Sequence, residues 1–187
     1  MLFRSVISCA VLLFSTLSSG VFAISTSCMT YEGMPLNAEY SVGTTKTFGD
    51  IFGELIGFEN EAGNWVEDGI ATIENGGKAH GSGKETNLNN IMQRLIFNVS
   101  EPTSVTFKYA DHGGVVNLGI NGTLNNVEDL SDLNGLTVNG VTIIVTRTNT
   151  FNGHYGTVAL IGTTDSIQRF AVGGQEFWLD DVCAQFP

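Results

Sequence analysis

The sequence predicts an all-β protein, a single-domain antiparallel β-sandwich of the jelly-roll type. Three observations lead to this prediction. Glycine is abundant, with 23 residues against 3 prolines, and Thr, Val, Ile and Phe recur in short runs of strand length. Asn-Gly pairs at 121–122, 139–140 and 152–153 are typical of tight hairpins. No long stretch has the apolar spacing of a helix.

The first half of the chain predicts three short strands, at 38–42, 46–48 and 70–73. Residues 51–58 are the best candidate for a short helix. Segments 60–65 and 78–84 are small, polar and glycine-containing, which indicates loops.

The second half predicts strands at closer and more regular intervals, at 92–99, 104–110, 115–120, 123–127, 136–138, 141–146, 155–161 and 167–172. In 104–110, Val105, Phe107 and Tyr109 alternate with Thr106 and Lys108, as in a half-buried strand. About ten short strands separated by turn signals favour a sandwich or barrel over a parallel sheet with crossover helices.

The last strand follows Gly173-Gly174 and runs through 177–183. Simple alternation places on one face Phe177, Leu179, Asp181 and Cys183, and on the other Trp178, Asp180 and Val182. Two adjacent carboxylates in an apolar strand are costly if they are buried alone. We therefore expect them to meet a cation, backbone donors or water.

Residues 1–23 have the pattern of a secretory signal peptide, which leaves 24–187 as one β-sandwich domain. Arg4 precedes an apolar run at 6–14, and Val21-Phe22-Ala23 is a plausible cleavage site. The run is too short to cross a bilayer, so we expect no membrane anchor. The predicted location is secreted, either extracellular or periplasmic.

Loss of the signal peptide would remove Cys9 and leave Cys28 and Cys183. Two cysteines in an exported chain have one possible intramolecular pairing, and this disulfide would make the first and last strands neighbours. The alternative is two thiols that are free or paired between molecules.

The net charge of the chain limits the classes of partner that we expect it to bind. Nineteen acidic residues against eight basic ones give a net charge of −11. This acidity argues against nucleic acid and against anionic membrane surfaces. It is compatible with neutral polysaccharide, with divalent cations, or with solubility alone.

Three short motifs occur in an order found in a known superfamily. They are Gly57-Phe58-Glu59 with Gly63-Asn64-Trp65, then Ala79-His80-Gly81-Ser82-Gly83, then Phe177-Trp178-Leu179-Asp180-Asp181-Val182. This order resembles the jelly-roll carbohydrate-binding modules of the galactose-binding-like superfamily. Gly81 interrupts the usual His-Ser-Gly order, and a segment with its own cysteine precedes the first motif.

The resemblance implies a structural calcium ion between the opening and closing strands. Its ligands would be Glu59 and Asp180, with Asp181 adjacent. Calcium prefers six to eight oxygen ligands, and carboxylates brought together without a cation would raise one another's pKa. The alternative is that these acids are exposed or cap turns.

A sugar-binding surface needs exposed aromatic rings with polar neighbours. The candidates are Trp65, Tyr109 and Tyr155, with His112 and Asn117 as polar partners. Tyr109 and Tyr155 adjoin turns, which favours exposure. Trp65, like Trp178, has burial in the core as its alternative.

Other chemistry has little support in the sequence. The three histidines lack metal-site spacing, and no Gly-x-Ser-x-Gly motif is present. Asp111, Glu128, Asp129 and Asp132 are possible hydrolase acids, but acids are common in the turns of an acidic protein. We therefore expect no enzyme.

Three functions follow, in order of preference. The first is a secreted, non-catalytic module that binds extracellular polysaccharide or glycan and carries a structural Ca²⁺. The second is a structural or adhesive surface protein that self-associates, suggested by strands rich in Asn, Gly and Thr with few charges. The third is a small polysaccharide lyase or hydrolase.

Overall fold

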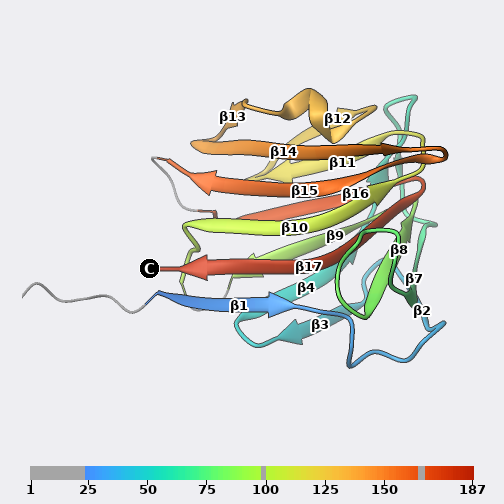
Figure 1. Ribbon diagram of the computed structural model, residues 1–187, viewed down its shortest axis with the longest axis horizontal. Helices are drawn as coiled ribbons and strands as arrows, with labels where there is room; N and C mark the ends of the chain where they lie inside the picture. The colour runs from blue at the N-terminus through green and yellow to red at the C-terminus, as the bar shows by residue number, and fades with distance from the viewer. Residues whose placement is uncertain (1–23, 98–99, 164–166) are drawn as a thin grey trace, which may run out of the picture.

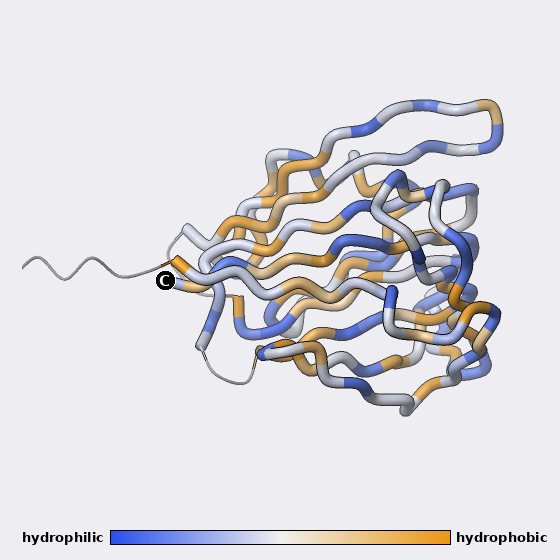
Figure 2. The backbone as a smooth tube through the Cα atoms, turned by 60° about the horizontal axis from the view of Figure 1, so that its bottom comes forward, coloured by the Kyte–Doolittle hydropathy of each residue, from blue (hydrophilic) through white to orange (hydrophobic). Residues whose placement is uncertain are grey.

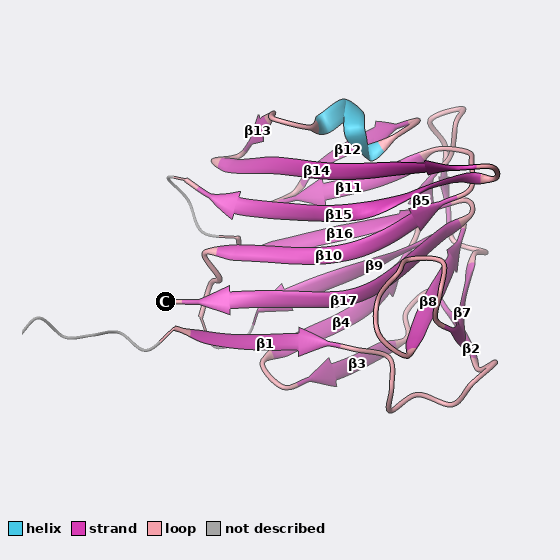
Figure 3. Cartoon of the chain, viewed as in Figure 1, coloured by secondary structure: helices cyan, strands magenta, loops and turns pink. Residues whose placement is uncertain are grey.

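The chain folds into two antiparallel β-sheets packed face to face, as the computed structural model shows (Figure 1). The structure describes residues 24–97, 100–163 and 167–187, so the predicted signal peptide lies outside it. Within these ranges one short 3₁₀ helix, η1 (Leu130–Leu133), is the only helical element (Figure 3). The predicted all-β antiparallel sandwich is confirmed.

The first sheet has nine strands. In spatial order these are β13 (Thr137–Val138), β14 (Val141–Thr150), β15 (Gly153–Gly162), β10 (Ser104–Asp111), β17 (Phe177–Phe186), β8 (Lys84–Asn89), β7 (Ile70–Asn75) and β2 (Glu39–Ser41). The ninth strand, β1 (Ser25–Met29), pairs with the second half of β17, while β8 pairs with its first half.

The second sheet has six strands, in the order β12 (Thr123–Val127), β11 (Val116–Ile120), β16 (Arg169–Gly174), β9 (Ile91–Phe97), β4 (Ile51–Ile56) and β3 (Thr45–Phe48). A separate two-stranded ribbon joins β5 (Phe58–Glu59) to β6 (Trp65–Val66). Consecutive strands pass repeatedly from one large sheet to the other, as in jelly rolls.

The core lies between the two large sheets. Apolar and polar residues alternate along the strands, so each sheet turns its apolar face inward (Figure 2). Phe107 of β10 stacks on Phe170 of β16 with ring centroids 5.7 Å apart, which joins the two sheets across the core. Tyr109 stacks in the same way on Phe177, at 5.8 Å.

A disulfide joins the two ends of the described chain, as predicted. Cys28 of β1 and Cys183 of β17 are direct partners in the antiparallel register, with Cα atoms 4.0 Å apart. The bond spans 155 residues of sequence. The first and last strands are therefore neighbours, and the bridge locks their register.

The alternation predicted for the last strand is wrong beyond Leu179. A β-bulge interrupts the pairing of β10 with β17 between Thr106 and Lys108, and opposite it Asp181 has a positive φ of 46°. Because of the extra residue, each side chain of β17 after the bulge points to the opposite face of the sheet from the one that simple alternation predicts. Val182 therefore joins Phe177 and Leu179 in the core instead of facing away from them.

Residues 51–58, the best candidate for a short helix, contain strands instead. Residues 51–56 form β4, with Ile51 and Leu55 buried and the side chains of Phe52, Glu54 and Ile56 half-buried. Over so short an apolar run, helical and strand periodicity are hard to tell apart, and pairing with β9 and β3 decides the outcome.

The loop between β7 and β8 folds back over the outer face of the nine-stranded sheet (Figure 1). Its Ala79 packs on Ala110 and Trp178. The buried carboxylate of Glu85 accepts hydrogen bonds from the backbone N–H groups of Gly77, Lys78 and Ala79, at 3.3, 3.2 and 2.9 Å. One side chain therefore holds the loop on the sheet.

Candidate functional site

The ribbon of β5 and β6 packs on the outer face of the six-stranded sheet. Phe58 is fully buried there, in a small cluster with Met92, Val115 and Ala171. The buried amide of Asn117 accepts from the N–H of Glu59 at 2.7 Å and donates to its carbonyl oxygen at 3.0 Å. This pair of bonds fixes the ribbon to β11.

Trp65 lies at the rim of a groove beside this ribbon. Its side chain is 49% exposed, and the indole lies over Gly57, where any Cβ would collide with the ring. The groove has a volume of about 280 Å³. It is lined by Ile56, Trp65, Met92, Arg94, Gly119, Asn121, Gly122, Thr123, Leu124, Arg169, Phe170 and Ala171.

The groove is hollow because the middle strands carry small side chains. The strand register aligns Arg94 of β9 with Ala171 of β16, Ala171 with Gly119 of β11, and Gly119 with Leu124 of β12. Ala171 and Gly119 form a low floor between the larger Arg94 and Leu124. We call this hollow the Trp65 groove.

Arg94 is held in place on one side of the groove. It forms an ion pair with Glu54, its partner across the β4–β9 pairing. Its Nε is buried and has no hydrogen-bond partner. Arg169 and Asn121 also line the groove, and the amide oxygen of Asn121 accepts from the N–H of Arg169 at 3.3 Å. The groove thus combines an aromatic face with guanidinium and amide groups.

The five predicted sugar-binding residues do not form one surface. Trp65 borders the groove, and Asn117 lies beneath the ribbon as its anchor. His112 and Tyr155 belong to a different cleft, on the nine-stranded sheet. The predicted exposure of Tyr109 is wrong, because the ring faces inward and is fully buried against Phe177.

The predicted calcium ligands are not gathered either. The Oε1 atom of Glu59 accepts from the side-chain amide of Asn126 at 3.1 Å, on the six-stranded sheet. Asp180 and Asp181 lie on β17, where Asp181 forms an ion pair with Lys108 at 3.1 Å. In the described part of the chain, no group of three or more His, Cys, Asp or Glu side chains could hold a metal ion.

Asp180 is buried among other acids. Its Oδ1 accepts from the N–H of Asp181 at 2.7 Å, while its Oδ2 is buried without a partner among the residues that the structure describes. Burial is the main cause that raises the pKa of Asp180 to about 7. The hydrogen bond from the N–H of Asp181 opposes this rise, and the charges of Asp181, Glu85 and Glu32 add to it. The carboxyl group lies against Gly81, which has no room for a side chain.

A second cleft brings together all three histidines of the chain. His80 comes from the β7–β8 loop, His112 from the turn after β10, and His154 from the β14–β15 hairpin. The cleft has a volume of about 190 Å³ and is lined by Gly77, Lys78, His80, Ala110, His112, Thr150, His154 and Tyr155. We call it the three-histidine cleft. No spacing pattern in the sequence indicates it, because three separate loops meet only in the fold.

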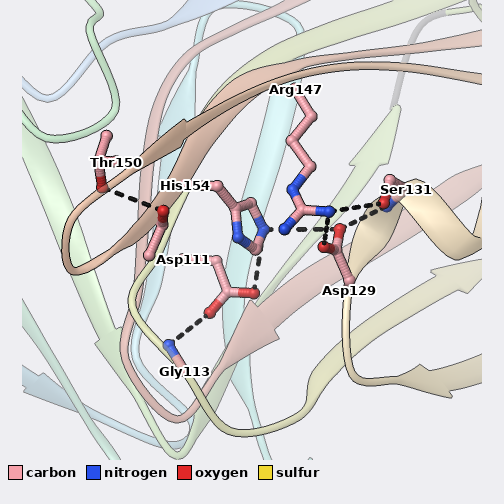
Figure 4. Close-up of polar contacts among 8 residues, drawn as sticks. Asp111, Gly113, Asp129, Ser131, Arg147, Thr150 and His154 are labelled. Atoms are coloured by element: carbon pink, nitrogen blue, oxygen red, sulfur yellow. Dashed lines mark hydrogen bonds and ion pairs between the residues drawn. The ribbon is translucent and has the colours of Figure 1, made fainter.

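Behind His154 lies a buried polar cluster (Figure 4). His154 Nε2 lies 3.5 Å from both Asp111 Oδ2 and Asp129 Oδ1, and Arg147 pairs with Asp129 at 2.8 Å. Asp111 also accepts from the N–H of Gly113 at 2.9 Å. Burial raises the pKa of Asp111 above its ordinary value, partly offset by Gly113 and His154.

By fold and site, the chain is an all-β antiparallel sandwich with a groove on one sheet and a histidine-lined cleft on the other. No protein-family model, no curated protein and no solved structure matches it. Among residues 24–97, 100–163 and 167–187, no helix is long and apolar enough to span a membrane.

Proposed function

We propose that this protein is a secreted, non-catalytic module that binds extracellular carbohydrate in the Trp65 groove. The observation that supports this proposal best is the half-exposed indole of Trp65 at the rim of a hollow with arginine and amide groups. The signal-peptide pattern and the Cys28–Cys183 disulfide fit an exported protein.

The chemistry of the groove matches that of a sugar ring. A pyranose has apolar C–H faces that pack on an indole, and hydroxyl groups around its edge that need hydrogen-bond partners. Arg94, Arg169 and Asn121 supply such partners around the apolar floor. A ring lying on Trp65 would meet donors from two strands and a turn.

The experiment is a calorimetric titration of the oxidised, mature chain with soluble xylan, β-glucan, mannan and galactan. Trp65→Ala is expected to weaken binding to the active glycan roughly tenfold or more, about 1.4 kcal/mol. Phe151→Ala is the matched control, because Phe151 is fully exposed at a hairpin tip away from the groove lining. Failure of all four glycans to bind, or an equal loss in both variants, would overturn the proposal.

We also propose a structural calcium ion at Asp180 and Asp181, beside the bulge in the middle of β17 and without Glu59. The unpartnered, buried Oδ2 of Asp180 is the observation that supports it. A folded-state ligand raises the free energy of unfolding by RT ln(1 + [L]/Kd). Calcium should therefore raise the unfolding temperature and chelator should lower it. Equal temperatures in both buffers would rule the ion out.

Self-association is the second candidate function. The hairpin between β14 and β15 exposes Phe151 completely at its tip, and Ile144 of β14 is 43% exposed. Exposed apolar side chains near a sheet edge can pair with a second copy. Light scattering at rising concentration tests this, and a constant monomer mass in both the parent chain and Phe151→Ala would exclude it.

A further inference from the structure

The three-histidine cleft is separate from the Trp65 groove. The groove lies on the six-stranded sheet, whereas the cleft is lined by residues from one end of the nine-stranded sheet and the loops around it. The two share no lining residue. A ligand of the cleft can therefore be tested independently of the carbohydrate proposal.

The rings and the lysine of the cleft are held by aromatic contacts. The Lys78 ammonium lies 3.6 Å from the centroid of the Trp178 ring, a favourable cation–π position. His112 packs against the same indole at 4.6 Å, and His80 stacks on Tyr155 at 3.7 Å. Lys78, His112 and His80 thus pack on the rings of Trp178 and Tyr155. The nitrogen-bearing edges of the histidines are left as polar groups of the cleft.

The carboxylates near the cleft have hydrogen-bond donors of their own. Glu85 accepts from the backbone of the β7–β8 loop, as described above. Glu74 accepts from Trp178 Nε1 at 2.9 Å and from the amide of Asn87 at 2.9 Å. Among the described residues, neither Glu74 nor Glu85 forms an ion pair with Lys78 or with a histidine of the cleft.

The remaining two acids stand behind His154. Asp111 and Asp129 carry two negative charges when ionised, and Arg147 supplies one positive charge. The Nε2 atom of His154 faces both carboxylates, so its Nδ1 edge is the part of the ring left for a ligand. His154 is 8% exposed, and within the described part of the chain its Nε2 has no hydrogen-bond partner. The ring therefore contacts this cluster on one side and lines the cleft on the other.

We propose that the three-histidine cleft binds an oxyanion group, the carboxylate or sulfate of an acidic ligand, and that binding strengthens as the histidines become protonated. An imidazolium donates from both nitrogens, and charge-assisted hydrogen bonds to oxyanions are the strong ones. Imidazole is the side-chain group that in general gains a proton in mildly acidic solution, so affinity measured at two pH values tests its part in binding. Lys78 supplies an ammonium group beside the histidines.

The acidity of the whole chain gives the cleft a selective role. A net charge of −11 repels anions from most of the surface. Lys78 and three histidines gathered in one cleft provide a local exception. The small volume, about 190 Å³, suits a single acidic group and not a long chain segment.

The test uses the full oxidised domain and three probes of similar size: galacturonate, galactose 6-sulfate and neutral galactose. Calorimetry at pH 5.5 and pH 8 is expected to show binding of one or both acidic probes, roughly tenfold tighter at pH 5.5. Binding of galacturonate alone assigns a carboxylate site, and binding of the sulfate alone assigns a sulfate site. Equal affinity for galactose in a Trp65→Ala background, where the aromatic face of the groove is missing, or no heat with any probe, would overturn the proposal.

Two variants test whether the acidic probe binds in the three-histidine cleft. Lys78→Met keeps an unbranched side chain over Trp178 but removes the charge, and His112→Gln keeps a polar side chain but cannot be protonated. Each is expected to weaken binding of the acidic probe several-fold, and His112→Gln should also reduce the pH dependence. Glu39→Ala, at an exposed position of β2 outside both sites, should leave it unchanged. Normal affinity in Lys78→Met and His112→Gln would place the anion elsewhere and contradict the proposal.

Discussion

At the residue scale, Asp180 shows how burial and neighbouring charge act together. The side chain is fully buried, one oxygen has a backbone donor and the other has none. Its desolvation and its acidic neighbours both oppose ionisation, so the pKa of Asp180 rises from 3.8 to about 7. Its neutral form is therefore favoured in the folded chain below that pH.

This shift predicts a pH-dependent stability. The carboxyl ionises near pH 4 in the unfolded chain but at about pH 7 in the folded chain, because its folded-state pKa is raised. Its contribution to the free energy of unfolding is complete below pH 4 and is lost as pH rises to about 7. Asp180→Asn should remove this loss and be more stable than the parent at pH 8, by on the order of 2–4 kcal/mol.

Urea unfolding at pH 4.5 and pH 8, in chelator, measures the effect. The amide oxygen that Asp180→Asn introduces can still accept from the N–H of Asp181, so the bulge should be retained. The prediction is contradicted if the free energy of unfolding falls by the same amount in the parent chain and in the variant between pH 4.5 and pH 8. If calcium binds at Asp180, the variant should also lose the calcium-dependent rise in unfolding temperature.

Single residues were also the hardest feature to predict. Tyr109 and Trp65 each stand near a turn, yet one is fully buried and the other is half-exposed. Alternation does place Tyr109 on the same face as Val105 and Phe107, and that face is the core. For Trp65 no such pattern exists, because its two-residue strand sits over Gly57 on a separate ribbon.

At the element scale, β17 and the loop over it depend on local irregularity. The bulge at Asp181 turns the second half of the strand, so that Val182 and Ala184 reach the core. Strand alternation predicts the facing of residues 177–179 correctly and fails after the bulge, because a bulge has no sequence signal as clear as Asn-Gly. At Asn121 and Asn139, by contrast, the predicted hairpins form with positive φ values of 48° and 47°.

The β7–β8 loop should depend on Glu85. Its carboxylate is buried and satisfies three consecutive loop N–H groups, so Glu85→Ala leaves these donors without a partner. We expect a loss of roughly 2–3 kcal/mol in the free energy of unfolding. Amide hydrogen exchange at residues 77–79 should accelerate more than exchange in β10. Glu39→Ala, on an exposed position of β2, is the control and should change neither quantity. Unchanged exchange in Glu85→Ala would show that packing of Ala79 alone holds the loop.

At the scale of the whole molecule, the sequence was most informative about the fold class and about the disulfide that joins the first and last strands. Turn signals and short apolar runs predict the sandwich, and two remaining cysteines predict which strands are neighbours. The sequence does not indicate which residues come together in either candidate site. The Trp65 groove depends on register across β9, β16, β11 and β12, and the three-histidine cleft depends on three loops meeting at one end of a sheet.

The disulfide should contribute much of the stability of the domain. It closes a loop of 155 residues, and loss of such a constraint on the unfolded chain is worth about 5 kcal/mol in the chain-entropy model. The double variant Cys28→Ser, Cys183→Ser should therefore unfold at a markedly lower urea concentration. Reductant should lower the midpoint of the parent chain toward that of the variant, and should leave the variant unchanged. An equal midpoint for the parent with and without reductant, after complete reduction is verified by thiol counting, would mean that sheet packing alone sets the stability. A large loss of stability would also support export of the protein, because a domain that needs this bond to remain folded can work only in a compartment where disulfides persist.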